Sequence, residues 1–555
     1  MTGAAKNMPA GKVAQHDYII VGAGSAGCVL AARLSEDPDV RVLLVEAGGR
    51  DRSLVIHTPA GADLLFKGGA ATWIYETAPQ AGLDGRVLID RRGRTLGGSS
   101  SINGMLYCRG EAGDYDGWAA GGAAGWSYAD VLPYFRRSEA HALGESEFHG
   151  GQGPLRVSRA PLNHPLARVW LEAARQAGYA HNEDVNGARR EGVGPSDWTV
   201  ADGRRMSAAV AYLRGAERRP NLKVMTGVHV TRIMIDKGRA TGIAYVKRGA
   251  ADQAIAAREV IVAAGALHSP QLLMLSGIGP ADHLRAHGVF PLVDLPGVGG
   301  NFHDHLGFST FVAASKPISA YSHFASLSGV RAAVRYFFTR TGPLAEPPVE
   351  AVGVFKSGVT PEAGADPKLL FIPILVQGGG TLIRQHGFMT RMSMTRPASR
   401  GTIRLRSADP MAPPLIDANY LAEESDLRRA RAGIRIARDI VDQPAFDPYR
   451  DQEIAPGPHA RSDADLDSYI RRTAEPDFHA AGSCRMGGDQ LAVVDHRLQV
   501  RGIEALRVVD ASVMPAVPSG NTNGAVIMIA EKASDIIRDR PPMTPWRSTA
   551  SAVVS

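Results

Sequence analysis

Three glycines near the start of the chain have the spacing that binds a nucleotide pyrophosphate. Gly22, Gly24 and Gly27 form a G-x-G-x-x-G motif between a β-branched run that begins at Asp17 and a helical stretch that continues to Leu34. In such a motif the first glycine makes a tight turn, the second lets backbone approach the pyrophosphate, and the third allows helix and strand to pack closely. The N–H groups at the helix N-terminus would then face the anion.

An acidic residue strengthens this interpretation. A second apolar strand, 40–45, ends in Glu46, nineteen positions after Gly27. A carboxylate there accepts hydrogen bonds from the hydroxyls of an adenosine ribose and repels a 2′-phosphate. The stretch 17–49 therefore predicts a βαβ unit for a cofactor that contains ADP, and by itself it leaves FAD and NAD open.

A run of small residues has the character of a second cofactor wall. The sequence RGRTLGGSSSINGMLY at 92–107 cannot build a core, but it lets backbone lie against a flat or charged group and supplies hydroxyl and N–H donors. A flexible linker is the alternative interpretation.

Later segments repeat the pattern of strand, small-residue turn and helix. A strand at 258–266 runs into a helix that Ser269-Pro270 is expected to open and Gly277 to close. Near the C-terminus a strand ends at Asp510, and a further helix is predicted at 525–538. Discontinuous segments of this kind are typical of a cofactor bound to a doubly wound sheet.

The middle of the chain has a different pattern of predicted strands and helices. Residues 221–236 are predicted to form a pair of strands, and Ser462 with Asp465 gives a capping-box start to one helix. Strands with helices to one side indicate an α+β domain with an antiparallel sheet, where a substrate wall would belong. The predicted strands are 349–355, 369–376, 391–395 and 402–406, and the predicted helices are 165–178, 330–339, 423–442 and 462–473.

Two histidines could suggest a metal ion. His303 and His305 flank Asp304, but no further ligand group is near them in the sequence. A structural Asp–His pair is the preferred interpretation, and no metal site is predicted.

Length and composition exclude several classes of protein. The 555 residues suggest about two to four domains, and 44% hydrophobic with 21% charged residues is typical of a globular protein. The net charge of +6 comes without a basic block, so no nucleic-acid partner is expected. Three cysteines fit a reducing compartment, and no apolar run is long enough for a transmembrane helix. We expect a cytoplasmic enzyme with disordered ends at 1–13 and 541–555, and leave a peripheral membrane contact open.

Together these motifs resemble those of the glucose-methanol-choline (GMC) family of flavin oxidoreductases, over essentially the whole chain. The resemblance rests on the glycine motif, the block at 93–116, the segments 265–279 and 297–305, and two C-terminal blocks that contain His479 and Asn521. It implies an α/β, Rossmann-like FAD-binding domain of the GMC type and an α+β substrate domain built on an antiparallel sheet. The expected FAD-binding domain comprises 14–160, 221–310 and 490–540, and the substrate domain 161–220 and 311–489.

The resemblance also assigns contacts to FAD. Some relatives attach FAD to a histidine where this chain has Ile102, so non-covalent FAD is expected. Gly22, Gly24 and Ser25 would meet the pyrophosphate, Glu46 the ribose, and Val230 the adenine; Gly98, Ser99, Asn103, Gly104 and Leu106 would line the isoalloxazine and ribitol; Asp510, Ala511 and Asn523 would close the site.

Two catalytic residues follow from the same resemblance. His479 matches the family's base, although His-Ala-Ala-Gly-Ser replaces the usual His-Pro-x-Gly-Thr, and Asn521 matches the second polar residue. A neutral imidazole is available near pH 7 to take the hydroxyl proton, and the amide can hydrogen-bond the developing alkoxide while hydride passes to the flavin.

The substrate and electron acceptor stay open at this point. Glu350 lies in a segment similar to that of choline-oxidising relatives, where it could hold a cationic head group or be a structural acid. The preferred expectation is a primary, uncharged aromatic or aliphatic alcohol oxidised to an aldehyde or onward to an acid. Choline oxidation, a hydroxynitrile lyase that retains FAD, and a non-catalytic flavoprotein are the alternatives. Dioxygen or a quinone would reoxidise the flavin, and the oligomeric state is not predicted.

Overall fold

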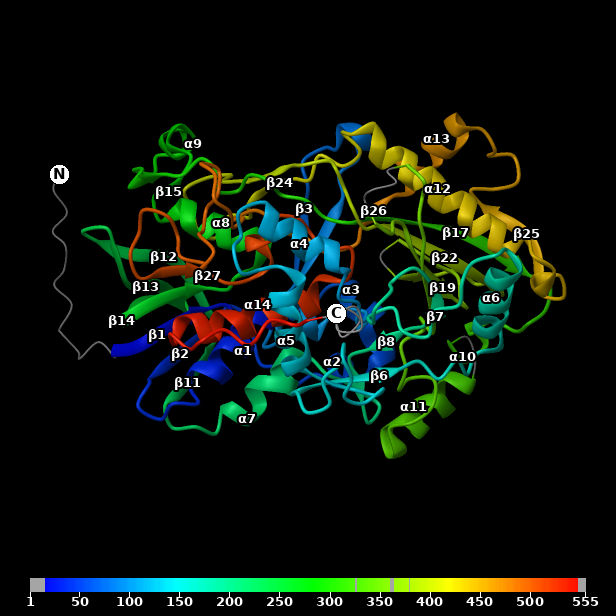
Figure 1. Cartoon of the computed structure of the whole chain (residues 1–555), viewed down its shortest axis with the longest axis horizontal. Coiled ribbons are helices and arrows are strands. Elements are labelled where there is room, and N and C mark those ends of the chain that lie inside the picture. Colours follow the sequence, from blue (N-terminus) through cyan, green and yellow to red (C-terminus); the bar gives the residue numbers. More distant parts are fainter. Residues whose placement is uncertain (1–14, 325–326, 360–363, 379, 548–555) are drawn as a thin grey trace, which may run out of the picture.

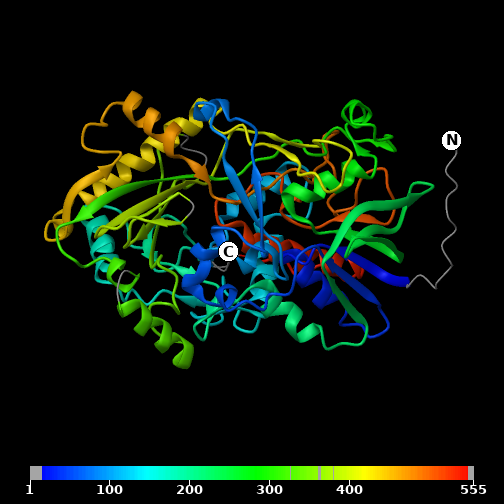
Figure 2. The ribbon, with the colours of Figure 1, turned by 180° about the vertical axis from the view of Figure 1, so that it is seen from behind.

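Two seven-stranded sheets lie at opposite ends of the molecule (Figure 1). The computed structural model describes residues 15–324, 327–359, 364–378 and 380–547. The view from behind shows the same division, with the blue N-terminal strand and the red C-terminal helix of the described chain in the same half (Figure 2). The expected disorder of 1–13 and of 548–555 lies outside the described residues. The domain boundaries expected from the sequence stay a prediction.

β-branched apolar runs form the first sheet. β1 (Gln15–Val21) lies between β2 (Val42–Glu46) and β14 (Ala250–Val262) and is parallel to both. β27 (Leu506–Val508) pairs in parallel with β14, so a C-terminal strand completes the N-terminal unit. The sheet has the order β11-β2-β1-β14-β13-β12, with β11 (Leu222–Thr226), β12 (Val228–Asp236) and β13 (Arg239–Lys247).

The pairing expected within 221–236 is wrong. Both strands exist, but β11 pairs in parallel with β2, whereas β12 pairs antiparallel with β13. The reason is that 228–262 forms a meander of its own, in which β14 is long enough to pair first with β13 and then with β1.

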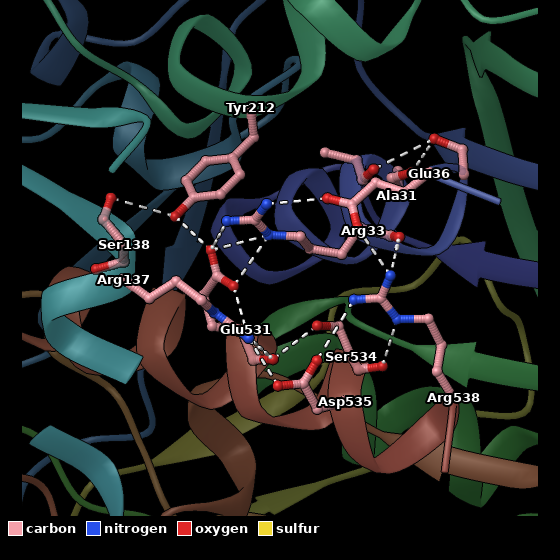
Figure 3. Close-up of polar contacts among 12 residues, drawn as sticks. Ala31, Arg33, Glu36, Arg137, Ser138, Tyr212, Glu531, Ser534, Asp535 and Arg538 are labelled. Atoms are coloured by element: carbon pink, nitrogen blue, oxygen red, sulfur yellow. Dashed lines mark hydrogen bonds and ion pairs between the residues drawn. The ribbon is translucent and has the colours of Figure 1, made fainter. Parts of the chain in front are cut away.

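A buried charge network joins the first and last helices of this half. Glu531 of α14 (Thr522–Ile537) is fully buried, 2.8 Å from Arg33 of α1 (Ser25–Leu34) and 2.8 Å from Arg137 of α5 (Tyr128–Ser138). The hydroxyl of Tyr212 donates to the same carboxylate at 2.9 Å. Figure 3 shows these side chains converging from separate segments. The network therefore ties the C-terminal helix to the helix that follows the glycine turn.

The second sheet is antiparallel, as predicted. Its order is β25-β17-β22-β19-β18-β7, with β26 paired to β17. Helices α6 (Pro165–Gln176), α12 (Glu424–Val441) and α13 (Asp463–Thr473) pack against it over an aromatic core that includes Trp170, Phe371 and Phe388. The Ser462–Asp465 capping box is confirmed. The strands are β7 (Gly192–Pro195), β17 (Leu306–Ala314), β18 (Ala351–Val354), β19 (Lys368–Ile372), β22 (Gly387–Met394), β25 (Arg450–Ala455) and β26 (Glu475–Pro476).

The predicted start of one helix is wrong. Helix α8 (Gly265–Leu275) begins at Gly265 and not at Ser269-Pro270. Proline inside a helix leaves the carbonyl four residues earlier without its N–H donor. Here that carbonyl, of Ala266, accepts the hydroxyl of Ser483 at 2.5 Å, which makes the earlier start tolerable.

Residues 541–547 are ordered, although the sequence was expected to be disordered from 541. The backbone N–H of Trp546 donates to Ala129 at 2.8 Å, and that of Met543 donates to the hydroxyl of Tyr134 at 3.1 Å. The Trp546 ring meets the ring of Tyr128 edge to face, at 5.9 Å between centroids. Aromatic packing against α5 therefore holds a segment whose composition gives no such signal.

Short elements complete the described chain. Within 15–547 and outside its gaps, no helix has the length and apolar character needed to span a membrane. The strand predicted at 402–406 is β23 (Thr402–Arg404), which pairs with β24 (Leu415–Asp417) outside the second sheet. Further helices are α2 (Leu54–His57), α3 (Ala62–Phe66), α4 (Ala112–Ala120), α7 (Arg214–Ala216), α9 (Ala281–Ala286), α10 (Tyr321–Phe324) and α11 (Leu327–Thr339); further strands are β3 (Thr72–Glu76), β4 (Ile89–Gly93), β5 (Glu139–His141), β6 (Leu155–Arg159), β8 (Asp197–Trp198), β9 (Val200–Ala201), β10 (Arg204–Arg205), β15 (Ile278–Gly279), β16 (Val293–Asp294), β20 (Val376–Gln377) and β21 (Thr381–Leu382).

Candidate active site

The turn between β1 and α1 forms part of the wall of a large cavity. Gly22 has a φ of +101°, and a Cβ there would lie 2.5 Å from the carbonyl oxygen of Ala263. A Cβ on Gly27 would lie 1.9 Å from the oxygen of Gly22, so the helix packs directly on the turn. A Cβ on Gly24 would have no protein atom within 4 Å, and Gly24 lines the cavity. The backbone at Gly24 is therefore open to a ligand, while the other two glycines are required by the fold.

Backbone N–H groups hold Glu46 at the end of β2. Its two carboxylate oxygens accept from Ala23 at 2.9 Å and from Gly48 at 2.8 Å. The residue is 7% exposed, and burial raises the pKa of Glu46 to about 7. Each oxygen keeps a lone pair, so the hydroxyls of a ligand can add to this arrangement.

The second small-residue block packs on the first. The short 3-10 helix η3 (Gly98–Ser101) begins at Gly98, where φ is +53° and a Cβ would lie 2.6 Å from the Cα of Gly24. The hydroxyl of Ser99 accepts from the backbone N–H of Gly93 at 3.1 Å. The flexible-linker interpretation of 92–107 is therefore wrong.

A buried arginine that the sequence analysis missed holds Asn103. Arg205 is fully buried, and its Nη1 donates to the backbone oxygen and to Oδ1 of Asn103, at 2.6 and 2.7 Å. Its Nε donates to the carbonyl of Ile56 at 2.7 Å, and burial lowers the pKa of Arg205 to about 9. In the sequence Arg205 belongs to a short basic pair with no sign of burial.

C-terminal residues close the cavity. Asp510 accepts from the backbone N–H of Gly265 at 2.9 Å and from the hydroxyl of Ser269 at 2.5 Å, which fixes the start of α8. The side chain of Asn523 accepts from the hydroxyl of Ser25 at 2.7 Å, which joins the starts of α14 and α1.

The cavity has a volume of about 1280 Å³ and contains every residue that the sequence assigned to FAD. The residues fit this cofactor, since the open backbone at Gly24, the N-terminus of α1 and the buried carboxylate of Glu46 suit a pyrophosphate and a ribose. The cavity also contains His479, Asn521 and Glu350. Its cofactor-type lining is Gly22, Gly24, Ser25, Glu46, Gly98, Ser99, Asn103, Gly104, Leu106, Val230, Asp510, Ala511 and Asn523.

The structure brings the two proposed catalytic residues into contact. Nε2 of His479 lies 3.0 Å from Nδ2 of Asn521, which occupies the N-cap position of α14. The other ring nitrogen of His479 lies 3.0 Å from Nδ1 of His305. Nζ of Lys368, the first residue of β19, donates to Oδ1 of Asn521 at 2.9 Å. A strand residue of the second sheet, loop residues next to that sheet and the N-cap residue of α14 therefore meet at one point.

The electrostatics of this point favour a neutral imidazole. Burial, and next the positive charge of Lys368, lower the pKa of His479 to about 3. Burial also lowers the pKa of Lys368 below its ordinary value. Although burial opposes it, Arg391 holds the pKa of Asp477 below its ordinary value, with Nε of the arginine 3.0 Å from the carboxylate.

The acid expected to pair with a histidine has another role. Asp304 accepts the backbone N–H of His479 at 2.6 Å and the hydroxyl of Tyr420 at 3.2 Å, so it supports the loop that carries His479. Burial raises the pKa of Asp304 to about 8. His303 instead accepts the backbone N–H of Val517 at 2.8 Å. Among the described residues, no group of three or more His, Cys, Asp or Glu side chains could hold a metal ion.

Sequence reasoning missed Lys368 and the contact of His305 with His479. Lys368 lies in an apolar strand pattern, and a lysine near a strand end is usually solvated. The one available signal was its place directly before the strand predicted at 369–376 in the substrate domain.

Glu350 is a buried carboxylate of the cavity wall. It lies immediately before β18, is 8% exposed, and accepts the backbone N–H of His164 at 3.1 and 3.3 Å. Burial raises the pKa of Glu350 above its ordinary value, and Arg168 lowers it only partly.

Comparison with known proteins defines the class. The GMC oxidoreductase family model matches residues 16–307 in its N-terminal part and 397–530 in its C-terminal part. The chain belongs to the GMC oxidoreductase family, and it is an FAD-dependent oxidoreductase that acts on CH–OH groups.

Individual relatives are similar over nearly their whole length. Mitochondrial choline dehydrogenase of Homo sapiens is 44% identical over 541 residues, which covers 95% of this chain and 91% of the relative. Oxygen-dependent choline dehydrogenase of Ectopseudomonas mendocina is 45% identical over 538 residues, with 95% of each covered. Pyridoxine 4-oxidase from Mesorbium loti is similar in structure, with a TM-score of 0.86 at 33% identity over 95% of this chain and 100% of that one.

Proposed function

We propose that this enzyme oxidises choline, or a close analogue with a cationic group beside a primary alcohol, to the aldehyde. The observation that carries the proposal is Glu350, a buried carboxylate in the same cavity as His479 and Asn521. Backbone N–H groups offset its charge only in part, and a bound cation would supply the rest. The identity of 44–45% to choline dehydrogenases supports this substrate over the uncharged alcohol that the sequence alone favoured.

The proposed chemistry uses two side chains at the alcohol oxygen. Nε2 of His479 takes the hydroxyl proton, and Nδ2 of Asn521 donates to the oxygen as it gains negative charge. Loss of that proton and of a hydride from the carbon turns the alcohol into the aldehyde. FAD, when bound, supplies the acceptor for the hydride. Asp304 keeps the His479 backbone in place during these steps.

Anaerobic mixing of the FAD-loaded enzyme with alcohols tests the proposal. Choline should bleach the flavin band, and 3,3-dimethylbutan-1-ol, which has the same shape without the charge, should do so with a lower kcat/KM. Glu350→Gln should lower kcat/KM for choline about 10- to 100-fold, as expected for loss of a buried charge partner, and leave the uncharged analogue nearly unchanged. Equal losses for both alcohols would contradict a cation site at Glu350.

Two alternatives have their own assays. A protein that leaves the flavin band unchanged with every alcohol but cleaves a cyanohydrin would be a hydroxynitrile lyase. Reoxidation by air and then by a quinone separates the two acceptors, and we expect dioxygen to serve, as the name of the Ectopseudomonas mendocina relative says of that enzyme.

We also propose that FAD is bound without a covalent bond. Ile102 is 3% exposed and lines the cavity, and its side chain cannot form such a bond. Acid precipitation should leave the flavin in solution, and a yellow pellet would contradict this.

A further inference from the structure

We propose that Lys368 positions the Asn521 amide and thereby fixes which nitrogen of His479 is free to take a proton. This makes Lys368 a positioning residue of the active site. The inference rests on the role of His479 as the base under the proposed function.

The first step concerns the direction of the amide. An ammonium group only donates hydrogen bonds, so the atom of Asn521 that lies 2.9 Å from Nζ of Lys368 must be the oxygen. The amide nitrogen must then face Nε2 of His479, at 3.0 Å. The oxygen and the nitrogen of an amide have nearly the same size, so without Lys368 little would keep the group from turning by 180°.

The second step concerns the imidazole. The amide nitrogen only donates, so Nε2 of His479 must accept and carries no proton. A neutral ring then has its proton on Nδ1, which faces Nδ1 of His305 at 3.0 Å and donates to it. The proton of His305 must therefore be on its Nε2, which is buried with no hydrogen-bond partner among the described residues. The hydrogen bonds therefore all point the same way, from Lys368 through Asn521 and His479 to His305.

This arrangement suits the reaction at the alcohol. The lone pair of Nε2 and the N–H of Nδ2 face each other. A substrate hydroxyl that inserts between them and replaces their direct contact can donate to Nε2 and accept from Nδ2. A turned amide would instead present its oxygen to Nε2 and favour a proton there, which would block the base. Lys368 is fully buried, so it cannot be a solvated surface charge that happens to lie nearby.

The positive charge of Lys368 also favours an unprotonated His479. The charged and titratable groups that face His479 are Lys368, Asp477, Arg92, Arg391, His305 and Asp304. Removal of the Lys368 cation should raise the pKa of His479, because that cation lowers it now. The acid side of the pH profile of kcat/KM should accordingly move to higher pH.

The first test measures flavin reduction by choline in FAD-loaded variants. Lys368→Met should slow reduction about 10- to 100-fold, the effect of losing a group that orients a catalytic residue, with FAD content unchanged. Lys368→Gln, which keeps an N–H donor, should recover part of the rate. Lys356→Met is the matched control, since that side chain is 61% exposed and pairs with Glu191. In an Asn521→Ala background, Lys368→Met should have little further effect.

The proposal is overturned if Lys368→Met reduces the flavin at the normal rate, or if its full effect persists without Asn521. A second measurement does not depend on the substrate. In protein labelled with ¹⁵N-histidine, the signal assigned to His479 by its absence in His479→Gln should show an unprotonated Nε2, and Lys368→Met should abolish this fixed tautomer. If choline fails as a substrate, the proposed function fails and the tautomer measurement still decides the role of Lys368. An unchanged tautomer in Lys368→Met overturns the inference.

Discussion

The affinity for FAD should depend on pH through Glu46. Burial raises the pKa of this carboxyl to about 7 in the protein without ligand. Ribose hydroxyls donate to the ionised carboxylate, so bound FAD stabilises the deprotonated form and lowers its pKa. Binding near neutral pH therefore releases a proton, and the affinity should fall as pH falls through about 7.

The size of the effect follows from the same value. At pH 8 most Glu46 is already ionised, whereas at pH 6 about nine molecules in ten must lose a proton first, at a cost of about 1.4 kcal/mol. The Kd for FAD should be roughly tenfold higher at pH 6 than at pH 8. Titration of the apoprotein with FAD, followed by flavin fluorescence, measures this directly.

Glu46→Gln is the matched control, because it keeps an acceptor and loses the titration. Its Kd should be nearly constant from pH 6 to 8. His229 and His268 also line the cavity. A pH dependence that persists in Glu46→Gln would assign the effect to such groups and refute the reasoning, as would a constant Kd in the unaltered protein.

Four other substitutions separate cofactor binding, chemistry and stability. Gly24→Ala should fold normally but bind FAD poorly, because its methyl group would meet only the contents of the cavity. Gly22→Ala should instead lower the free energy of unfolding, because its methyl group would clash with Ala263. Thermal melts of the two apoproteins and titration with FAD check this pair. His479→Ala should stay yellow and lose about 10²- to 10⁴-fold in flavin reduction by choline, the usual worth of a positioned base, and a near-normal rate would contradict its role. Glu531→Ala should lower the free energy of unfolding in urea by about 3 kcal/mol, because it leaves Arg33, Arg137 and Tyr212 without their shared partner (Figure 3). A decrease below about 1 kcal/mol, typical of a surface ion pair, would contradict a structural network.

Local sequence determined the features that depend on neighbouring residues. The glycine turn and Glu46 lie within one βαβ unit, so their spacing already predicted the ADP-binding end of the cavity. The Ser462–Asp465 capping box likewise depends on four successive residues, about one helical turn, and appears as predicted. The antiparallel second sheet was predicted from short strands at regular spacing with helices to one side, which are local features, although its central strands are buried on both faces. A cytoplasmic location stays a prediction from composition.

Tertiary structure alone decided how distant segments meet. α8 begins at Gly265 because Asp510 and Ser483, far away in the chain, satisfy groups that the local Ser-Pro signal would leave unpaired. The segment at Trp546 is ordered because an aromatic surface on α5 receives it.

The reaction centre shows most clearly that contacts between distant segments cannot be predicted from local sequence. Resemblance placed His479 and Asn521 in the site. Lys368 has no local pattern that marks it, and the pattern around His305 did not reveal its contact with His479. The physical reason is that periodicity reports which face of a strand or helix is buried, whereas the direction of a hydrogen bond depends on which donor the fold brings to that face. The sequence therefore determined the cofactor and the class of reaction, and only the assembled fold decided which side chains orient the base.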